Sequence, residues 1–259
     1  MGPIIDLRIQ PKRSQVDSFG TTRMYMNKIA ERITQVQDTI HETCARVGRN
    51  PDEIRLVIVT KSAPLEAIQE VVRLGFHDLG ENHVQQLKKV STELTGMAED
   101  GKAPPLRWHM IGHLQRNKVK QVVPTTFLIH SVDTLRLAEE ISVFATKLKQ
   151  KARVLLQVNT SNEPQKYGVP VGAATHLAEQ VQTLSGIEIC GLMTMAPLTR
   201  NKEVVRACFI RAHELFVEMR GERIVGPAFT QISMGMSSDY EVAIEEGATI
   251  LRIGSAIFA

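Results

Sequence analysis

Hydrophobic side chains recur every three to five residues in the first part of the chain, as on one face of an amphipathic helix. These positions are Met24, Ile29, Ile33, Val36, Ile40 and Cys44. Gly48 and Pro51 follow and are typical of a helix end and a turn. The pattern predicts a long helix from about residue 22, and residues 1–21, which contain prolines and few apolar groups, are expected to form a weakly ordered arm.

After this helix, short apolar segments alternate with helical patterns. The expected strands are 55–60, 76–79, 107–111, 127–132, 153–158, 188–193, 231–234 and 249–253. The expected helices between them are 64–74, 84–94, 134–148, 173–184, 203–219 and 239–246. Eight strands alternating with helices predict an α/β fold with a parallel sheet, and their number favours one closed (β/α)8 barrel over residues 22–259. Two open α/β halves are the alternative, although no linker rich in Pro, Gly or Ser marks a boundary.

Composition is typical of a soluble globular protein. A net charge of +3 on 259 residues, with both signs interspersed, gives no electrostatic reason to expect a nucleic-acid or membrane partner. No apolar stretch approaches the roughly 20 residues that span a bilayer, and no secretory signal is apparent. The cysteines Cys44, Cys190 and Cys208 lie far apart, which argues against a disulfide framework or a zinc module. We expect a cytoplasmic protein.

Lys61 is the first charged residue after the apolar run of the first expected strand. The carboxyl ends of parallel strands are where ligands bind in α/β folds. A lysine there, beside apolar surface, is suited to Schiff-base chemistry. The ordinary alternative is a lysine that simply leaves the strand into solvent.

Small and polar residues stand at the ends of the other expected strands. They are Gly80, Glu81, Asn82, Gly112, His113, Ser131, Asp133, Asn159, Thr194, Ser233, Gly235, Gly254 and Ser255. Turns and helix caps account for many of them. Gathered at one mouth of a barrel, they also form a candidate site.

Two of these stretches are suited to a phosphate group. One leaves a strand at Gly235, passes Ser237 and Ser238 and enters a helix, whose free N–H groups favour an anion. The other offers the backbone and hydroxyl groups of Gly254 and Ser255. Neither matches a Walker or Rossmann motif, and capping of the helix by Ser237 or Ser238 is the structural alternative.

Arg252 interrupts the last expected strand and shares a face with Gly254 by strand alternation. A buried arginine must find an acceptor. The candidates are a carboxylate, such as that of Glu81 or Asp239, and a ring nitrogen of a bound cofactor.

Two other features carry less weight. His109 and His113 could be written as a metal pair, but no third ligand follows at a suitable spacing, so no metal site is expected. The basic run 116–120 is typical of a solvated surface.

Several stretches together carry a family resemblance. They are VTKSAP, LGENHVQQL, RWHMIGHLQRNK, IHSVDT, LLQVNTS, GLMTMAP and ISMGMSSDYEVAIEEGATILRIGSAIF. On them the chain resembles the pyridoxal phosphate homeostasis proteins (the YggS/PROSC-like family) and, in fold, the N-terminal barrel of alanine racemases. The resemblance implies that Lys61 forms the internal aldimine with pyridoxal 5′-phosphate, PLP, and that Arg252 faces the pyridine nitrogen. It further places Asn82 beside the ring and gives the phosphate site as Ser233, Met234, Gly235, Gly254 and Ser255.

The function that this resemblance implies is PLP homeostasis, in which PLP is held on the lysine and buffered or supplied to PLP-dependent apoenzymes. An arginine can only donate hydrogen bonds, so it cannot keep a proton on the ring nitrogen, and the ring is then a weaker electron sink. Alanine racemases also take a catalytic tyrosine from a second domain, whereas this sequence ends at Ala259. We therefore expect a carrier without turnover. The alternatives are a fold-type III PLP-dependent racemase or decarboxylase, and a metal-dependent or phosphosugar barrel without PLP.

Overall fold

Eight parallel strands close into a barrel in the computed structural model, which describes residues 18–98, 105–161, 163 and 165–259. The strands are β1 (Arg55–Val59), β2 (Asp78–Glu81), β3 (Arg107–Met110), β4 (Thr126–Val132), β5 (Ala152–Asn159), β7 (Ile187–Met193), β8 (Gln231–Ser233) and β9 (Ile250–Ile253). Pairing of β1 with β9 and of β4 with β5 closes the sheet. The predicted (β/α)8 barrel is confirmed, and the alternative of two open halves is wrong.

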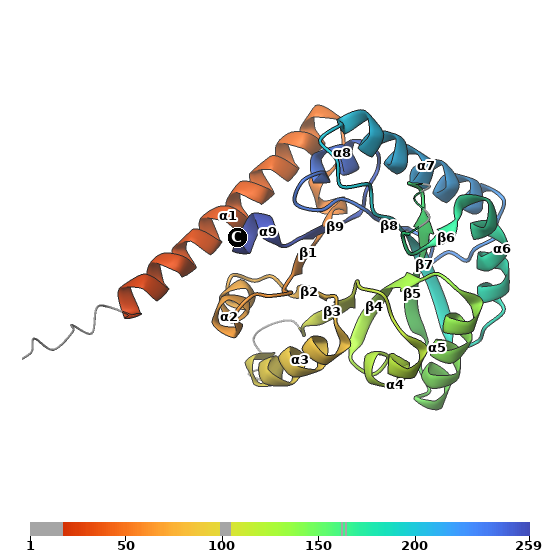
Figure 1. Cartoon of the computed structure of the whole chain (residues 1–259), viewed down its shortest axis with the longest axis horizontal. Coiled ribbons are helices and arrows are strands. Elements are labelled where there is room, and N and C mark those ends of the chain that lie inside the picture. Colours follow the sequence, from red (N-terminus) through yellow and green to blue (C-terminus); the bar gives the residue numbers. More distant parts are fainter. Residues whose placement is uncertain (1–17, 99–104, 162, 164) are drawn as a thin grey trace, which may run out of the picture.

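Helices surround the strands on the outside of the barrel (Figure 1). They are α2 (Leu65–Arg73), α3 (Val84–Ala98), α4 (Val119–Val122), α5 (Leu135–Lys147), α6 (Val171–Gln182), α7 (Lys202–Gly221) and α8 (Tyr240–Glu245). Short 3-10 turns lie at η1 (Pro51–Glu53) and η2 (Arg116–Lys118). The sequence pattern did not reveal β6 (Val169–Pro170), which pairs with β5, or α9 (Ser255–Phe258), since segments this short show no period.

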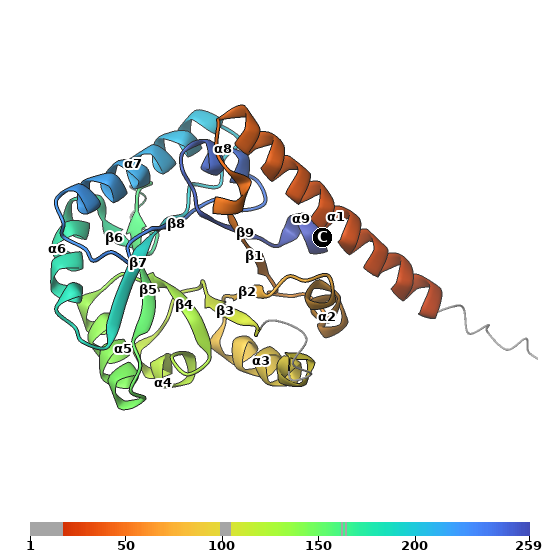
Figure 2. The same cartoon turned by 180° about the vertical axis from the view of Figure 1, so that it is seen from behind.

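The first helix, α1 (Ser18–Arg46), lies across the outside of the barrel against α8 and α9 and extends past them in both views (Figures 1 and 2). Its buried apolar side chains belong to the expected stripe and are Ile29, Ile33, Val36, Ile40 and Cys44. The Arg32 guanidinium also donates to the carbonyl oxygen of Ile257 at 3.1 Å. The helix begins four residues before the expected start, and residues 1–17 of the expected arm lie outside the described residues.

The core has an outer and an inner layer. The outer layer packs the strands against the helices with apolar side chains, for example Ile58, Leu79 and Phe209. The inner layer fills the barrel and contains a smaller apolar cluster, Val57, Leu128, Leu155, Cys190, Met193 and Ile250. Buried polar side chains share this interior: Asp78, His109, His130, Ser233 and Arg252. Since buried polar groups need hydrogen-bond partners, the interior must be organised around their contacts.

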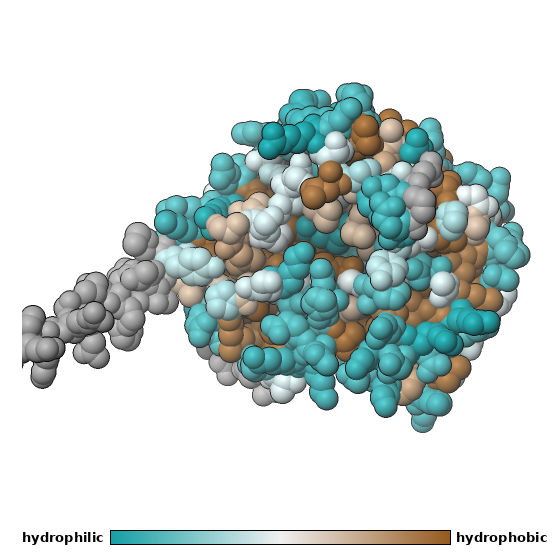
Figure 3. Space-filling model, viewed as in Figure 1, coloured by the Kyte–Doolittle hydropathy of each residue, from teal (hydrophilic) through white to brown (hydrophobic). Residues whose placement is uncertain are grey.

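The face seen in Figure 3 is covered largely by hydrophilic side chains, with apolar ones showing between them. Across the described part of the chain, none of the helices combines the length and the apolar character that crossing a membrane requires.

Candidate functional site

Lys61 stands at the carboxyl end of β1 in an exposed turn. The residue before it, Thr60, is fixed to the neighbouring strand: its N–H donates to the carbonyl oxygen of Gly80 at 3.0 Å, and its hydroxyl donates to Glu81 Oε1 at 2.5 Å. β1 ends at Val59, and Lys61 follows two positions later in the turn that leaves the strand. Lys61 is therefore an exposed residue at the carboxyl mouth of the barrel, accessible to a ligand.

Asn82 follows β2 and is half-buried at this mouth. The backbone of Gly112 approaches it so closely that a side chain at Gly112 would lie 2.2 Å from the Asn82 carbonyl oxygen. Asn82 lines a cavity of about 340 Å³ together with His83, Val84, Gln85, His113, Gln115 and Lys118. The sequence-predicted residue thus borders a hollow on the expected side of the barrel.

The two loops expected to hold a phosphate meet after β8 and β9. Gly235 has φ +91°, and a Cβ atom there would lie 2.6 Å from Ala243 Cβ, so the turn requires glycine. The Ser237 hydroxyl accepts hydrogen bonds from the N–H groups of Gly254, at 3.3 Å, and Ala256, at 3.1 Å. The structural alternative, in which Ser237 or Ser238 caps the following helix, is wrong: the residue at the cap position is Asp239, and Ser237 ties the two loops together.

The remaining predicted residues of these loops differ in exposure. Ser233 and Met234 are fully buried, Gly254 is half-buried, and Ser255 is exposed. Gly254 packs against β1, because a Cβ atom there would lie 3.0 Å from the carbonyl oxygen of Val59. Since Lys61 follows Val59 by two residues, the structure brings the β9 loop and the lysine to the same part of the mouth.

Arg252 is buried in the barrel, with 4% of its surface exposed. Its Nη1 donates to Ser233 Oγ at 2.6 Å, and its Nη2 donates to the carbonyl oxygen of Thr194 at 3.0 Å. Both acceptors are neutral. Burial lowers the pKa of Arg252 to about 10, against the opposing charge of Asp239, so the side chain keeps its charge at neutral pH.

The two carboxylates that were candidate acceptors for Arg252 have other hydrogen-bond partners. Glu81 accepts from Thr60, and Asp239 Oδ1 accepts from the N–H of Met236 at 2.6 Å. Burial raises the pKa of both carboxyl groups. A buried positive charge met only by neutral acceptors favours a ligand that brings an acceptor or a negative charge.

A row of hydrogen bonds lies behind Arg252 in the barrel interior. His130 Nδ1 lies 2.9 Å from Ser233 Oγ, and His130 Nε2 lies 2.9 Å from His109 Nδ1. His109 Nε2 lies 2.9 Å from Asp78 Oδ1. Sequence reasoning missed His130, although strand alternation with Leu128 could have placed it inside the barrel, and it treated His109 only as a possible metal ligand.

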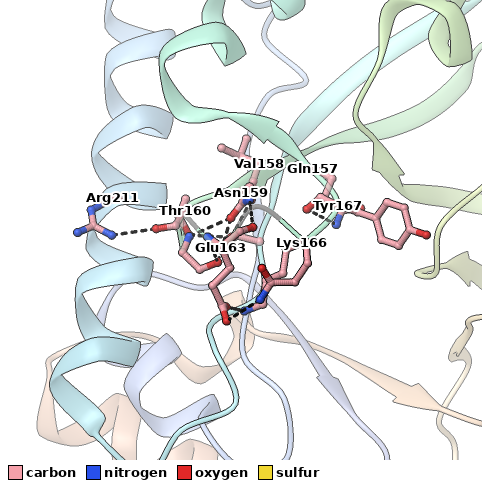
Figure 4. A network of polar contacts seen from close by, with 11 residues as sticks. Gln157, Val158, Asn159, Thr160, Glu163, Lys166, Tyr167 and Arg211 are labelled. Atoms are coloured by element: carbon pink, nitrogen blue, oxygen red, sulfur yellow. Dashed lines mark hydrogen bonds and ion pairs between the residues drawn. The ribbon is translucent and has the colours of Figure 1, made fainter.

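Asn159, also expected at this mouth, anchors a loop. Its Nδ2 donates to the carbonyl oxygen of Glu163 at 2.9 Å, and Arg211 of α7 donates to the carbonyl oxygen of Thr160 at 2.9 Å (Figure 4). The loop ends at Tyr167, whose ring stacks on that of His113 with the ring centres 4.1 Å apart. His113 is thus packed against an aromatic ring.

The donors at the carboxyl mouth suit a phosphorylated ligand that can react with an amine. Serine hydroxyls of the loops after β8 and β9 can donate to an anion, and the Gly254 N–H there donates to Ser237 in this structure; Arg252 supplies a fixed charge, and Lys61 supplies a primary amine. None of these features alone would indicate such a ligand. Their presence together at one mouth of the barrel does.

Known proteins are similar to this chain in sequence and in fold. The sequence pattern of the alanine racemase N-terminal domain matches residues 35–259. The chain is 40% identical over 228 residues to the pyridoxal phosphate homeostasis protein of Aquifex aeolicus (strain VF5), a match that spans 88% of this chain and 96% of that protein. Alanine racemase of Clostridium difficile 630 is 13% identical with a TM-score of 0.64, over 92% of this chain and 56% of that one, and shares the fold.

Among solved structures, PipY of Synechococcus elongatus PCC7942 with PLP bound has a TM-score of 0.76 at 32% identity. The match covers 89% of this chain and all of that one, 100%. The barrel, the matched domain pattern and these identities agree. The chain therefore belongs to the pyridoxal phosphate homeostasis protein family, built on the alanine racemase N-terminal barrel.

Proposed function

We propose that this protein binds PLP at the carboxyl mouth of its barrel, with Lys61 as the covalent attachment point, and that it acts in PLP homeostasis. The observation that carries the proposal is the pairing of two cations at one mouth: the exposed amine of Lys61 and the buried guanidinium of Arg252, which meets only neutral acceptors. The names of the relatives and the PLP-bound structure of PipY support it.

The residues present fit this cofactor. Gly235, Gly254 and Ser255 would hold the phosphate with backbone and hydroxyl groups, beside the buried Ser233 and Met234. Arg252 would donate to the pyridine nitrogen, and Asn82 would lie beside the ring. When bound, the cofactor supplies an aldehyde that reacts with primary amines and an electron-withdrawing ring.

We further propose that the protein carries PLP without turning over an amino acid. Arg252 keeps its charge and can only donate, so it cannot hold a proton on the ring nitrogen. The ring is then poorly suited to stabilise a carbanion. In this role the protein would buffer PLP in the cytoplasm and supply it to PLP-dependent apoenzymes.

The attachment is tested by reducing PLP-loaded protein with borohydride and mapping the pyridoxyl group by peptide mass spectrometry. We expect the adduct on Lys61, loss of the visible absorption band in Lys61→Ala, and no loss in Lys120→Ala, a control at an exposed lysine of α4. An adduct that maps to another lysine, or a Lys61→Ala protein that keeps the band, contradicts the proposal.

A second assay distinguishes this carrier function from the alternative, an amino-acid racemase or decarboxylase. Loaded protein is incubated with single amino acids, and chirality and CO2 release are followed. We expect neither to change above the rate of free PLP. Turnover that depends on Lys61 would identify an enzyme instead of a carrier.

A further inference from the structure

We infer that Asp78, His109 and His130 are positioning residues for the ligand site, because an unbroken row of hydrogen bonds joins them to Ser233 and Arg252. The inference rests on the proposed function, since the ligand whose place they fix is PLP. None of these three side chains is at the mouth where Lys61 stands. They act through Arg252.

The row crosses the barrel from one strand to another. Asp78 lies on β2, His109 on β3 and His130 on β4, which are neighbours in the sheet. Ser233 lies on β8, which does not pair with β4, so the 2.9 Å contact from His130 to Ser233 spans the barrel interior. All four residues are 7% exposed or less. His109, His130 and Ser233 are fully buried, so they have no contact with solvent.

The proton positions in the row follow from the ionised state of Asp78 at one end of it. Hydrogen bonds from His109 and Arg107 outweigh the effect of burial and lower the pKa of Asp78 to about 2, so its carboxylate is ionised and only accepts. His109 Nε2 must then carry a proton. Burial lowers the pKa of both histidines, which are therefore neutral, and a neutral imidazole has one donor and one acceptor.

The proton positions of the remaining hydrogen bonds, as far as Arg252, follow from this one. His109 Nδ1 accepts from His130 Nε2–H, and His130 Nδ1 accepts from the hydroxyl of Ser233. The Ser233 oxygen keeps its lone pairs for Arg252, which can only donate. Every donor in the row points from Arg252 toward Asp78. The arginine at one end can only donate and the carboxylate at the other can only accept. While both histidines are neutral, this direction of the hydrogen bonds is therefore the only one possible.

An added proton would disturb this order. A charged His130 would donate from Nδ1 to Ser233, which would have to turn its hydroxyl away, and it would bring a second positive charge to the buried Arg252. The groups that face His130 are His109, Arg252 and Arg55, and those that face His109 are Asp78, Arg55, Arg107 and His130. Apolar side chains in the barrel interior would avoid the unfavourable desolvation of so many polar groups. The row is therefore better explained by a role in holding the Arg252 side chain in one position than by a contribution to stability.

The proton positions are tested in cofactor-free protein by nitrogen-15 NMR of the histidine rings, assigned with His109→Asn and Ser233→Ala. We expect both His109 and His130 to be neutral with the proton on Nε2 at neutral pH. An imidazolium, or a proton on Nδ1 of either ring, overturns the inference. This result does not depend on whether PLP binds.

The effect on the site is tested with a pair of variants at His109. In His109→Asn the side-chain oxygen replaces Nδ1 as the acceptor for His130, whereas His109→Leu removes that acceptor and leaves His130 free to reverse its proton. For PLP, measured by absorbance titration, we expect binding about tenfold weaker for His109→Leu and within about threefold of the wild type for His109→Asn. The pH midpoint of the visible band should move only in His109→Leu.

Two outcomes separate the inference from the proposed function. If wild-type protein and both variants bind PLP equally and share one pH midpoint, the positioning role is overturned while PLP binding stands. If wild-type protein binds no PLP, the proposed function fails, and the NMR result alone decides the proton order. Should His109→Leu not fold, His130→Phe, which removes the link between His109 and Ser233, takes its place with the same expectation.

Discussion

Two cationic side chains at one mouth of the barrel have opposite surroundings. Lys61 is exposed in a turn, whereas Arg252 is 4% exposed and held by Ser233 and Thr194. An exposed amine can be released by a ligand and bound again, which suits a reversible attachment. A buried guanidinium cannot move away, so in the proposed function it would set where the ligand's ring lies.

The charge of Arg252 should matter for the ligand more than for the fold. In Arg252→Gln the amide can still donate to Ser233 or Thr194, but the buried charge is gone. We expect the free energy of unfolding to stay the same or rise, since burial of a charge is unfavourable, and PLP binding to weaken by about 2 kcal/mol.

Absorbance titration of Arg252→Gln measures PLP binding, and urea unfolding of the same samples measures the free energy of unfolding. The control is Arg220→Gln, an exposed arginine on α7. A loss of stability that accompanies unchanged PLP binding would show that Arg252 is a structural group only.

At the scale of elements, the site depends on connections outside the barrel. The loops after β8 and β9 lead directly into α8 and α9, and α1 packs against both of these short helices (Figure 1). Arg46 of α1 pairs with Glu245 of α8 at 2.6 Å, and Arg32 donates to the carbonyl oxygen of Ile257 in α9. A six-residue and a four-residue helix have little stability of their own. Helix α1 therefore supports the loops that would hold the phosphate.

Removing a buried side chain of α1 should weaken this support. Ile33 is 2% exposed within the outer core, and we expect Ile33→Ala to lower the free energy of unfolding by about 2 to 4 kcal/mol. Asp38→Ala, on the exposed face of the same helix, should change it by less than about 0.5 kcal/mol. Urea unfolding measures both. Equal effects of the two variants would mean that α1 does not pack on the barrel as described.

At the scale of the molecule, closure of the sheet leaves no strand edge among the eight barrel strands. The barrel interior is unusual in holding an ionised carboxylate, Asp78, with Arg107 and His109 as its partners. Burial raises the pKa of Asp78, but the hydrogen bonds and the Arg107 charge prevail and lower it from 3.8 to about 2. Asp78 thus links the stability of the whole barrel to pH.

The sign of this effect follows from the lowered pKa. The carboxylate form stabilises the folded state above the unfolded pKa, 3.8, and this contribution is lost as the pH falls toward 2. We expect the wild type to lose about 2 kcal/mol more than Asp78→Asn between about pH 5 and pH 2. Urea unfolding at a series of pH values measures it. Asp38→Asn, an exposed carboxylate, serves as control and should follow the wild type.

The sequence by itself determined the elements, the class of fold and much of the candidate site. Periods of two and of about 3.6 residues are local properties, so they located all eight barrel strands and put Lys61 after the first strand and Arg252 within the last. Gly235 could likewise be expected in a turn, because the conformation it adopts is one that other residues avoid. The order of motifs was enough to suggest the family.

Only the tertiary structure decided the partners. Arg252 could have met Glu81 or Asp239 by sequence reasoning, yet it meets Ser233 and the Thr194 backbone, because β8 pairs with β9 and β7 follows beside β8, while Glu81 is bound by Thr60. The bond from His130 to Ser233 crosses the barrel between residues 103 positions apart, which no local pattern encodes. Hydrophobic periodicity fixes which face of a strand is buried. Which buried polar groups meet inside depends on the closure and register of the whole barrel.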